Sequence, residues 1–293
     1  MKKKKIRPGD FVLDATIYLL LIVIFIVMLY PVWYVVVASF TTSSEVALSG
    51  GLLLWPKEFV TGAYELVFQN GRLMNGFKNS ILIELISLPL NILLTLIAGY
   101  FMASSNVMWK KPIVMMMMFT MFFGGGMVPN YLNIKSLGLI NTLWSLILPG
   151  VVTYYRCIIC KTAIEAIPAS LPESAFIDGA NDFQVILRIL VPLIKPTLAV
   201  LLLYYGVGHW NAWFNASIYL RDETWTPVSN VLRSLLIENT ELLANVTGGD
   251  HFDDYAETVK YAAIVVSTLP IMCVYPFLQK YFAKGAMVGA VKG

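Results

Sequence analysis

One short stretch of this chain indicates its fold: Glu173-Ser-Ala-Phe-Ile-Asp178-Gly179-Ala180-Asn-Asp182, with Val191-Pro192 and Pro196 close behind it. The stretch is charged, it is broken by a glycine, and it lies between long apolar runs. A membrane-spanning chain gains nothing from such a compact polar interruption unless a group outside the bilayer binds it. The stretch therefore predicts a segment that faces water and contacts a partner.

The rest of the chain has the composition of an integral membrane protein. Of its 293 residues, 58% are hydrophobic and 13% are charged, and its mean hydropathy is +0.71. Soluble domains carry about a quarter charged residues. Several apolar runs are long enough to cross a bilayer, which predicts an all-α protein with six transmembrane helices. The expected spans are residues 14–37, 80–102, 112–123, 143–160, 189–205 and 261–281. No small-residue cleavage site follows the first run, so it is expected to remain as a span.

The placement of Lys and Arg predicts that both termini are cytoplasmic. With six spans both ends lie on one side, and that side holds 14 of the 21 basic residues: Lys2, Lys3, Lys4, Lys5, Arg7, Lys110, Lys111, Arg156, Lys161, Arg188, Lys195, Lys280, Lys284 and Lys292. The opposite loop, 206–260, carries three basic and eight acidic residues. Cytoplasmic loops are rich in Lys and Arg. The Lys-rich start is accordingly expected to touch anionic lipid rather than nucleic acid.

These predictions describe a single transmembrane domain over residues 1–293. Residues 1–13 form its cytoplasmic N-terminal segment, 161–188 its longest cytoplasmic loop and 206–260 an extracellular loop.

The cytoplasmic loop itself predicts a helix–turn–helix that lies along the membrane. Ser170 is a plausible N-cap and Pro172 suits a first helical turn. Gly179 permits a sharp bend, after which a second helix, 182–190, leads back to the membrane. The expected apolar surface consists of Ala175, Phe176, Ala180 and Phe183. Periodicity alone is equally compatible with an ordinary amphipathic interfacial helix.

The spacing within this loop resembles the EAA loop of ABC-importer permeases. That signature reads Glu-Ala-Ala, three residues, Gly, nine residues, Ile, one residue, Leu-Pro. Here Glu173 begins the stretch, and nine residues separate Gly179 from Ile189. The chain departs from the signature at Ser174 and Val191, which are small or volume-similar replacements.

The likeness extends over nearly the whole chain. Residues 141–149, 167–168 and 279–293 are similar to the MalG-type permease of carbohydrate importers. Residues 210–220, Trp-Asn-Ala-Trp-Phe-Asn-Ala-Ser-Ile-Tyr-Leu, resemble the polysaccharide and oligosaccharide branch of that family.

The resemblance implies a type I ABC-importer permease in the bacterial plasma (inner) membrane, which translocates oligosaccharides or polysaccharide fragments. It also implies that the cytoplasmic loop is a coupling helix in a cleft of an ATPase subunit, where Glu173 makes a polar contact and Gly179 permits the turn. The implied coupling residues are Glu173, Ser174, Ala175, Asp178, Gly179, Ala180 and Pro192.

The partners implied by the resemblance are a second, homologous permease in a heterodimer, two ATP-binding cassette subunits, and an extracellular or lipid-anchored solute-binding protein. ATP and Mg would be bound by the ATPase subunits. This chain has no Walker A sequence and shows no catalytic set, so it is expected to be a non-catalytic subunit without a cofactor of its own.

A sugar presents hydroxyls and flat apolar faces, so its path is expected to combine aromatic rings with amides or carboxylates. The candidates are Glu84, Asn91, Tyr100, Trp144, Tyr204, Tyr205, Trp210, Asn211, Trp213 and Phe214. The group 210–214 is favoured because it lies at the predicted outer mouth. Two alternatives stay open: Trp and Tyr near span ends are often interfacial belt residues, and Glu84 would reach interfacial water if it lies near the outer end of its span.

Three other functions stay open: an ABC permease for a non-sugar solute, a membrane-embedded enzyme and an autonomous carrier. Cys157 and Cys160 have redox or zinc spacing but no second pair, which favours packing. His251 with Asp250, Asp253 and Asp254 has the residue types of a metal cluster, but a solvated acidic loop is the favoured interpretation, and no metal is expected.

Overall fold

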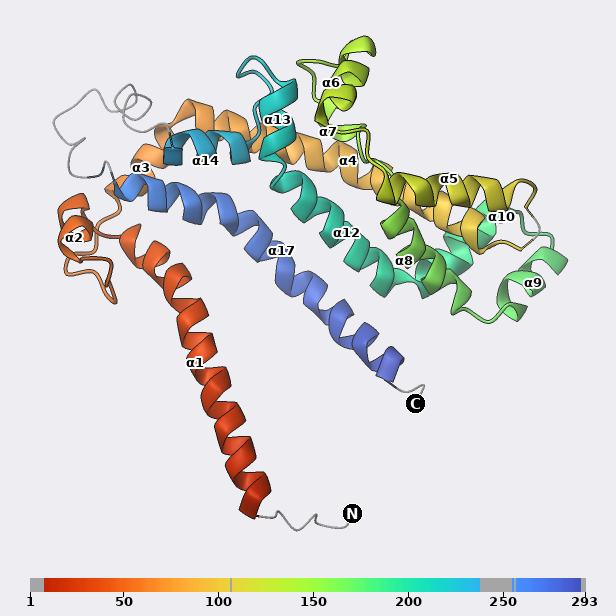
Figure 1. The fold of residues 1–293 in the computed structure, drawn as a ribbon, viewed down its shortest axis with the longest axis horizontal. Helices are drawn as coiled ribbons and strands as arrows, with labels where there is room; N and C mark the ends of the chain where they lie inside the picture. Colours follow the sequence, from red (N-terminus) through yellow and green to blue (C-terminus); the bar gives the residue numbers. More distant parts are fainter. Residues whose placement is uncertain (1–7, 106, 238–254, 256, 291–293) are drawn as a thin grey trace. The chain divides into compact units, whose positions relative to one another are not determined.

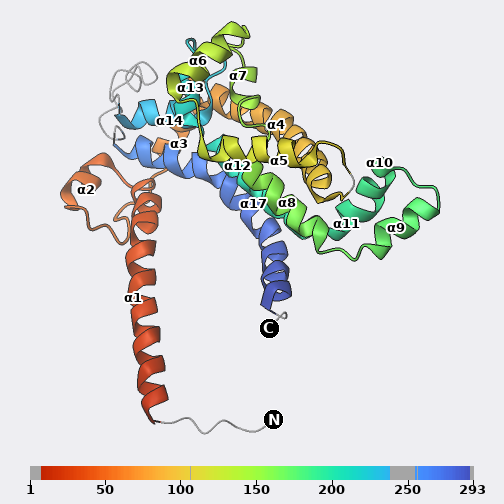
Figure 2. The same cartoon turned by 45° about the vertical axis from the view of Figure 1, so that its right-hand side comes forward.

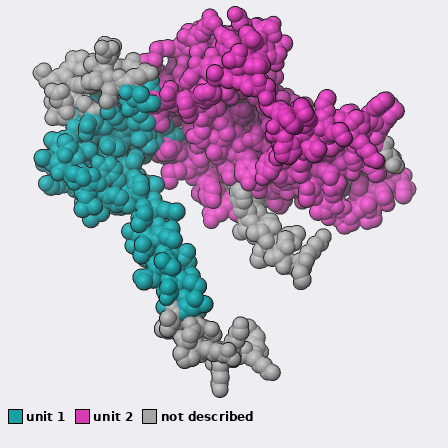
Figure 3. All heavy atoms as spheres, in the orientation of Figure 1, with its two compact units in different colours: residues 1–70, 234–267 teal, residues 71–233, 268–293 magenta. Residues whose placement is uncertain are grey.

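The structure, a computed structural model, describes residues 8–105, 107–237, 255 and 257–290. Every regular element within these ranges is helical, and they contain no strand, which confirms the expected all-α class. The chain divides into two compact units, one formed by Met1–Asn70 and Ser234–Ser267 and the other by Gly71–Arg233 and Thr268–Gly293 (Figure 3).

The first unit is built on the long apolar helix α1 (Pro8–Ala38). The chain after it folds back onto its end through the short helices α2 (Ser43–Leu48) and α3 (Gly62–Gln69). Tyr30 donates a hydrogen bond to the carbonyl of Gly51 (2.7 Å), and the indole N–H of Trp33 donates to the carbonyl of Leu54 (2.8 Å). A small core of Val37, Ala38, Val46 and Leu53 lies beneath.

The second unit is organised around α4 (Gly71–Ala103), α8 (Tyr154–Glu165) and α12 (Lys195–Trp210), which pack side by side (Figures 1 and 2). The other helices wholly within it are α5 (Lys110–Phe122), α6 (Met127–Ser136), α7 (Trp144–Ile147), α9 (Ser170–Ile177), α10 (Asp182–Gln184), the π-helix η1 (Val185–Leu190), α11 (Val191–Leu193) and α13 (Trp213–Tyr219). Two helices, α14 (Val228–Ile237) and α17 (Thr258–Ala290), continue from one unit into the other.

Among the described residues, three helices are long and apolar enough to cross a membrane: Leu13–Ala38, Gly71–Ala103 and Thr258–Phe277. They match the predicted spans 14–37, 80–102 and 261–281. Asp182–Leu193 and Lys195–Trp210 would pass the same test together, but they are bent by 87° at the break between them.

This bend corrects the predicted continuous span 189–205. Its cause is local, because Pro196 has no N–H to donate and its ring clashes with the carbonyl four residues earlier. The backbone leaves the helical region at Ile194, where φ is −94° and ψ is 14°.

The predicted span 143–160 is also not one helix. Its residues form α7, a turn and the start of α8, and Pro149 and Gly150 lie in the gap. Gly150 has φ +90°, which is a conformation that glycine adopts at little cost. The predicted helix 112–123 forms as α5, whose 13 residues reach about 20 Å, less than the roughly 30 Å of a bilayer core. The count of six spans stays a prediction.

Candidate functional site

The charged, glycine-broken stretch of residues 173–182 forms a helical hairpin, which consists of α9, a turn and α10. Its first helix, α9, has Ala169 as N-cap, so the predicted cap Ser170 lies one residue inside the helix. At the other end, the N–H of Gly179 donates to the carbonyl of Phe176 (3.1 Å) and that of Ala180 to Ala175 (2.9 Å). This pair of bonds is a Schellman C-cap. Gly179 has φ +85°, the left-handed conformation that the motif requires.

The second helix starts from a capping box. The side chain of Asn181 accepts from the N–H of Gln184 (2.9 Å), and the side chain of Gln184 accepts from the N–H of Asn181 (3.0 Å). The predicted helix 182–190 is present as α10 followed by η1. Because a cap ends one helix and another starts the next within four residues, the turn between them has a defined shape.

The apolar residues of the hairpin face two ways, which corrects the expectation of one apolar surface. Ala175 and Ala180 pack against the core cluster of Leu96, Cys160, Ile164, Val185, Ile186, Leu190, Ile194 and Leu201. Phe176 and Phe183 are exposed, and the side chain of Ile177 is 86% exposed. Ile177 was missed in the sequence, although its place beside Asp178-Gly179 at a helix end was a usable signal.

The polar coupling candidates Glu173, Ser174 and Asp178 are all exposed on the same hairpin. Pro192 is not part of the tip, because it lies in α11 beside the 87° bend.

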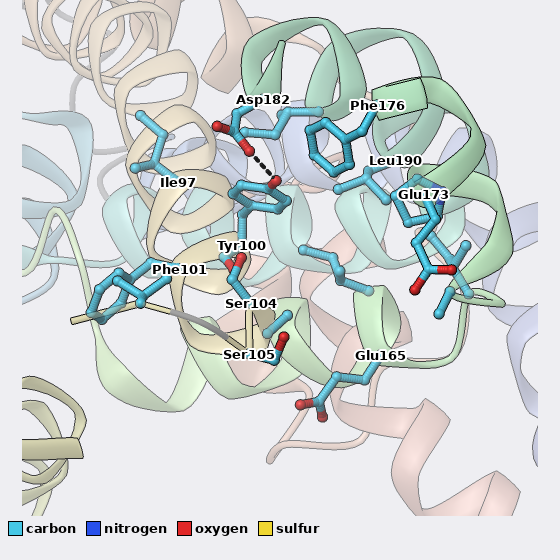
Figure 4. A pocket seen from close by; sticks show the side chains of 17 residues that line it. Ile97, Tyr100, Phe101, Ser104, Ser105, Glu165, Glu173, Phe176, Asp182 and Leu190 are labelled. Atoms are coloured by element: carbon cyan, nitrogen blue, oxygen red, sulfur yellow. Dashed lines mark hydrogen bonds between the residues drawn. The ribbon is translucent and has the colours of Figure 1, made fainter. Parts of the chain in front are cut away.

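A pocket of about 750 Å³ lies between the end of α4 and this hairpin (Figure 4). Tyr100 donates a hydrogen bond to the carboxylate of Asp182 at 2.5 Å, which ties α4 to α10 across the pocket. Glu165 and Glu173 are among the side chains that line it. The hairpin is therefore held against the core at both its apolar face and this polar contact.

Two of the predicted pathway residues, Asn91 and Tyr205, meet in a polar cluster between α4, α8 and α12. The amide of Asn91 donates to the carbonyl of Val151 (2.9 Å), and its oxygen lies 3.1 Å from Nε2 of His209. The hydroxyl groups of Tyr205 and Thr95 are 2.6 Å apart. Sequence reasoning missed Thr95, His209 and Arg156 as members of this cluster.

Arg156 completes the cluster from the first turn of α8. Its guanidinium carbon lies 3.9 Å from the centre of the Tyr205 ring, and it donates to the carbonyl of Tyr204 (3.1 Å). Arg156 was counted among the cytoplasmic basic residues. The structure adds that it contacts Tyr204 and Tyr205 of α12, and its side in the membrane stays a prediction.

The group 210–214 does not form one aromatic surface. Trp210 is buried, with its ring 6.2 Å from that of Phe77. Trp213 is partly exposed beneath Arg233, whose guanidinium carbon lies 4.3 Å from the ring centre, and it meets Phe214 edge to face.

The other pathway candidates are dispersed. Asn211 is exposed and its amide donates to the carbonyl of Val207 (2.9 Å) at the end of α12. The side chain of Tyr204 is exposed on α12, and Trp144 is exposed at the start of α7.

Glu84 lines a separate apolar pocket of about 310 Å³, with Leu88, Leu202, Leu203, Gly206, Val207, Trp210, Pro270, Ile271 and Val274. Both of its carboxylate oxygens are buried, so the alternative in which Glu84 reaches interfacial water is wrong for this structure.

Cys157 and Cys160 are buried, unpaired cysteines, and Cys160 belongs to the core cluster, which confirms their packing role. The residues His251, Asp250, Asp253 and Asp254 lie outside the described part of the chain. Elsewhere in the described chain, no group of three metal-ligating side chains is found.

Comparison with known proteins places this arrangement in a family. The model of the "Binding-protein-dependent transport system inner membrane component" matches residues 71–288. The polygalacturonan/rhamnogalacturonan transport system permease protein YtcP of Bacillus subtilis (strain 168) is 35% identical over 281 residues, which are 96% of this chain and 98% of that protein. Protein LplC of the same strain is 38% identical over 266 residues, which are 90% and 89% of the two chains.

A solved structure agrees. It is a chain of a bacterial ABC transporter involved in the import of the acidic polysaccharide alginate, and it superposes with a TM-score of 0.87 at 27% identity, covering 94% of this chain and 98% of that one. Together these likenesses make the chain a non-catalytic, multi-pass permease subunit of a bacterial ABC importer for sugars. It has the type I permease fold and belongs to the family of binding-protein-dependent transport system inner membrane components.

Proposed function

We propose that this chain is one of two homologous permease subunits in an ABC importer for oligosaccharides, and that its coupling site is the hairpin α9–α10. The observation that supports this assignment is the geometry of the hairpin. It exposes Glu173, Ile177 and Asp178, and it continues through η1 and α11 into α12. A movement imposed on such a capped, core-packed element is passed on to α4, α8 and α12 as a rigid-body displacement.

The proposed topology has six membrane-crossing segments within a single permease domain over residues 1–293. Both termini and the loop 161–188 are cytoplasmic, and 206–260 is extracellular. In this arrangement the bent segment α10–α12 contributes one crossing, and the interrupted stretch α7–α8 contributes another. The asymmetry of Lys and Arg along the sequence supports it.

The proposed partners are a second permease, two ATPase subunits and an extracellular or lipid-anchored binding protein. The ATPases bind ATP and Mg, and this chain binds neither. A family model whose description names a binding-protein-dependent system supports the binding protein. In the proposed coupling contact, Glu173 and Asp178 supply charge, Ile177 supplies an apolar knob, and Ser174, Ala175, Gly179 and Ala180 keep the hairpin slim enough to enter a cleft. Pro192 stiffens the segment that leads from the hairpin to α12.

The proposed cargo is an oligosaccharide derived from an acidic polysaccharide. Two similar proteins, a polygalacturonan/rhamnogalacturonan permease and a chain of an alginate importer, support this class. Within the chain, the cluster around Asn91 and Tyr205 lies on the proposed path. Tyr204, Asn211, Trp213 and Phe214 present exposed polar and aromatic groups further along it, and Trp144, Trp210 and Glu84 are proposed to line its walls.

The coupling assignment is tested by Gly179→Asn in the complete transporter. Asn is among the few residues that adopt the left-handed conformation readily, so the turn persists. A Cβ at Gly179 meets no atom of the described residues within 4 Å, apart from its chain neighbours. The added side chain therefore projects outward, and in the proposed complex it would enter the ATPase cleft. Sugar uptake and sugar-stimulated ATP hydrolysis are expected to fall about tenfold or more, as for the loss of roughly 1.4 kcal/mol in docking. Immunoblots should show an unchanged amount of inserted permease.

The matched control is Gly138→Asn. Gly138 also has a positive φ, +69°, and a Cβ there also meets no atom within 4 Å, but the residue follows α6 rather than lying in the hairpin. Its uptake should match the wild type. Normal uptake by Gly179→Asn would show that this turn does not enter a cleft.

A further inference from the structure

Arg156, on α8, is held on a framework of residues from two other helices, α4 and α12. Its guanidinium stacks on Tyr205, which is fully buried and is fixed by the contact with Thr95. The ring of Tyr205 in turn stacks on His209, with centres 6.5 Å apart and planes 15° apart. His209 contacts Asn91, which is anchored on the carbonyl of Val151. The position of the cation is therefore defined by packing at several points.

The charge of Arg156 has no acidic partner in the part of the chain that the structure describes. The ion pairs there are Arg72 with Glu223 and Lys161 with Glu165. A guanidinium carries five N–H donors, and within the same residues one hydrogen bond of Arg156, to the carbonyl of Tyr204, uses one of its nitrogens. The remaining donors fit a planar anion, which arginine binds through two parallel hydrogen bonds.

The surroundings of Arg156 are open on one side. The residue is only partly buried, and on α12 the neighbouring Tyr204, Val207 and Gly208 are exposed. Gly208 lies directly beside the cation, since a Cβ at Gly208 would be 3.6 Å from a guanidinium nitrogen of Arg156. Because glycine has no side chain, the backbone next to the guanidinium is not covered. In the proposed topology Arg156 lies within a crossing, where ionisable groups face a bundle interior or a water-filled cavity rather than lipid. The proposed path of the solute runs along this open side.

We propose that Arg156 is a binding residue for the carboxylate of an acidic sugar during its passage, with Tyr205 and Thr95 as its supporting platform. The inference rests on the proposed function and adds to it the place where negative charge is recognised. A neutral sugar gains nothing from this cation, whereas a uronate residue offers two oxygens at the spacing of the guanidinium fork.

The test uses the complete transporter in vesicles with two probes, a tetramer of galacturonic acid and the same tetramer with its carboxyl groups reduced to alcohols. Each is supplied on saturating binding protein. Arg156→Gln keeps hydrogen-bond donors but removes the charge, and it is expected to lower uptake of the acidic tetramer about tenfold while changing uptake of the neutral tetramer less than about twofold. Arg156→Lys keeps the charge but lacks the two parallel N–H donors of a guanidinium. Its uptake of the acidic tetramer should lie between that of the wild type and that of Arg156→Gln. Lys111→Gln, which removes an exposed charge in α5, should alter neither rate.

The outcomes separate this inference from the function on which it rests. An equal fall for both probes in Arg156→Gln assigns the residue a structural role and overturns the inference. If the variants fail to assemble, the wild type decides, because uptake of the neutral tetramer as fast as the acidic one also overturns it. A wild-type transporter that imports neither tetramer, nor any other oligosaccharide, overturns the proposed function itself.

Discussion

At the scale of single residues, two glycines act for different reasons. Gly179 is needed for its conformation, since its φ is +85° and the space around it is open. Gly99 is needed for its size, since a Cβ there would lie 2.8 Å from Sγ and 2.9 Å from Cβ of Cys160. The shape of the hairpin turn depends on Gly179, and the close approach of α4 and α8 depends on Gly99.

Gly99→Ala is expected to destabilise the permease by about 1–3 kcal/mol, because overpacking a filled contact forces α4 and α8 apart. Thermal unfolding of the purified chain in detergent measures the change. Gly71→Ala is the control: it lies at the start of the same helix with open space around it, and it should leave the unfolding temperature unchanged or slightly raised. An unfolding temperature of Gly99→Ala equal to that of the wild type would refute the tight contact.

At the scale of elements, the coupling hairpin is joined to the second unit in two ways. Ala175 and Ala180 bury its inner face against the core cluster. The hydrogen bond from Tyr100 to Asp182 adds a polar link between α4 and α10. Either contact alone would leave the hairpin free to pivot, whereas both together make its movement a movement of the core.

Tyr100→Phe removes only the polar link. Local opening of the hairpin is expected to become easier by about 0.5–1.5 kcal/mol, the usual net worth of such a bond. Hydrogen exchange of the backbone amides in residues 170–184 should accelerate accordingly, with little change in α4. Tyr155→Phe is the control, because Tyr155 is exposed on α8. Unaltered exchange in Tyr100→Phe would mean that the apolar contacts alone hold the hairpin.

At the scale of the whole molecule, two of the proposed membrane crossings are not continuous helices. In the proposed topology, the 87° bend before α12 and the gap between α7 and α8 place irregular backbone among the membrane segments. Such backbone is tolerated within a bilayer only where protein or a water-filled cavity surrounds it. Both breaks lead into α8 and α12, the helices that carry the polar cluster of Arg156 and Tyr205.

The proposed topology predicts the sidedness of two exposed positions, Ile177 in the hairpin and Leu48 at the end of α2. In a background with Cys273→Ser, a membrane-impermeant maleimide should label Leu48→Cys in intact cells and Ile177→Cys only after the membrane is opened. The remaining cysteines, Cys157 and Cys160, are buried and should react little. Labelling of Ile177→Cys in intact cells would invert the proposed orientation.

The sequence by itself determined the features that depend on short stretches of chain. Apolar runs defined α1, α4 and α17, because the length of a run is a local property. The glycine in Glu173–Asp182 marked the coupling turn, because a left-handed residue is required whatever the turn packs against. The same local spacing carried the resemblance to the permease family.

Only the tertiary structure decided which distant residues meet. Arg156 and Tyr204 are 48 positions apart, and Asn91 and His209 are 118 apart, so no periodicity brings them together. Sequence reasoning accordingly missed the contact of Arg156 with α12. It also grouped Trp210 with Trp213, although the fold buries the first and leaves the second exposed. The physical reason is that contacts between helices depend on where prolines and glycines bend them and on how closely they pack. Local propensity determines neither the bend angle nor the packing partner.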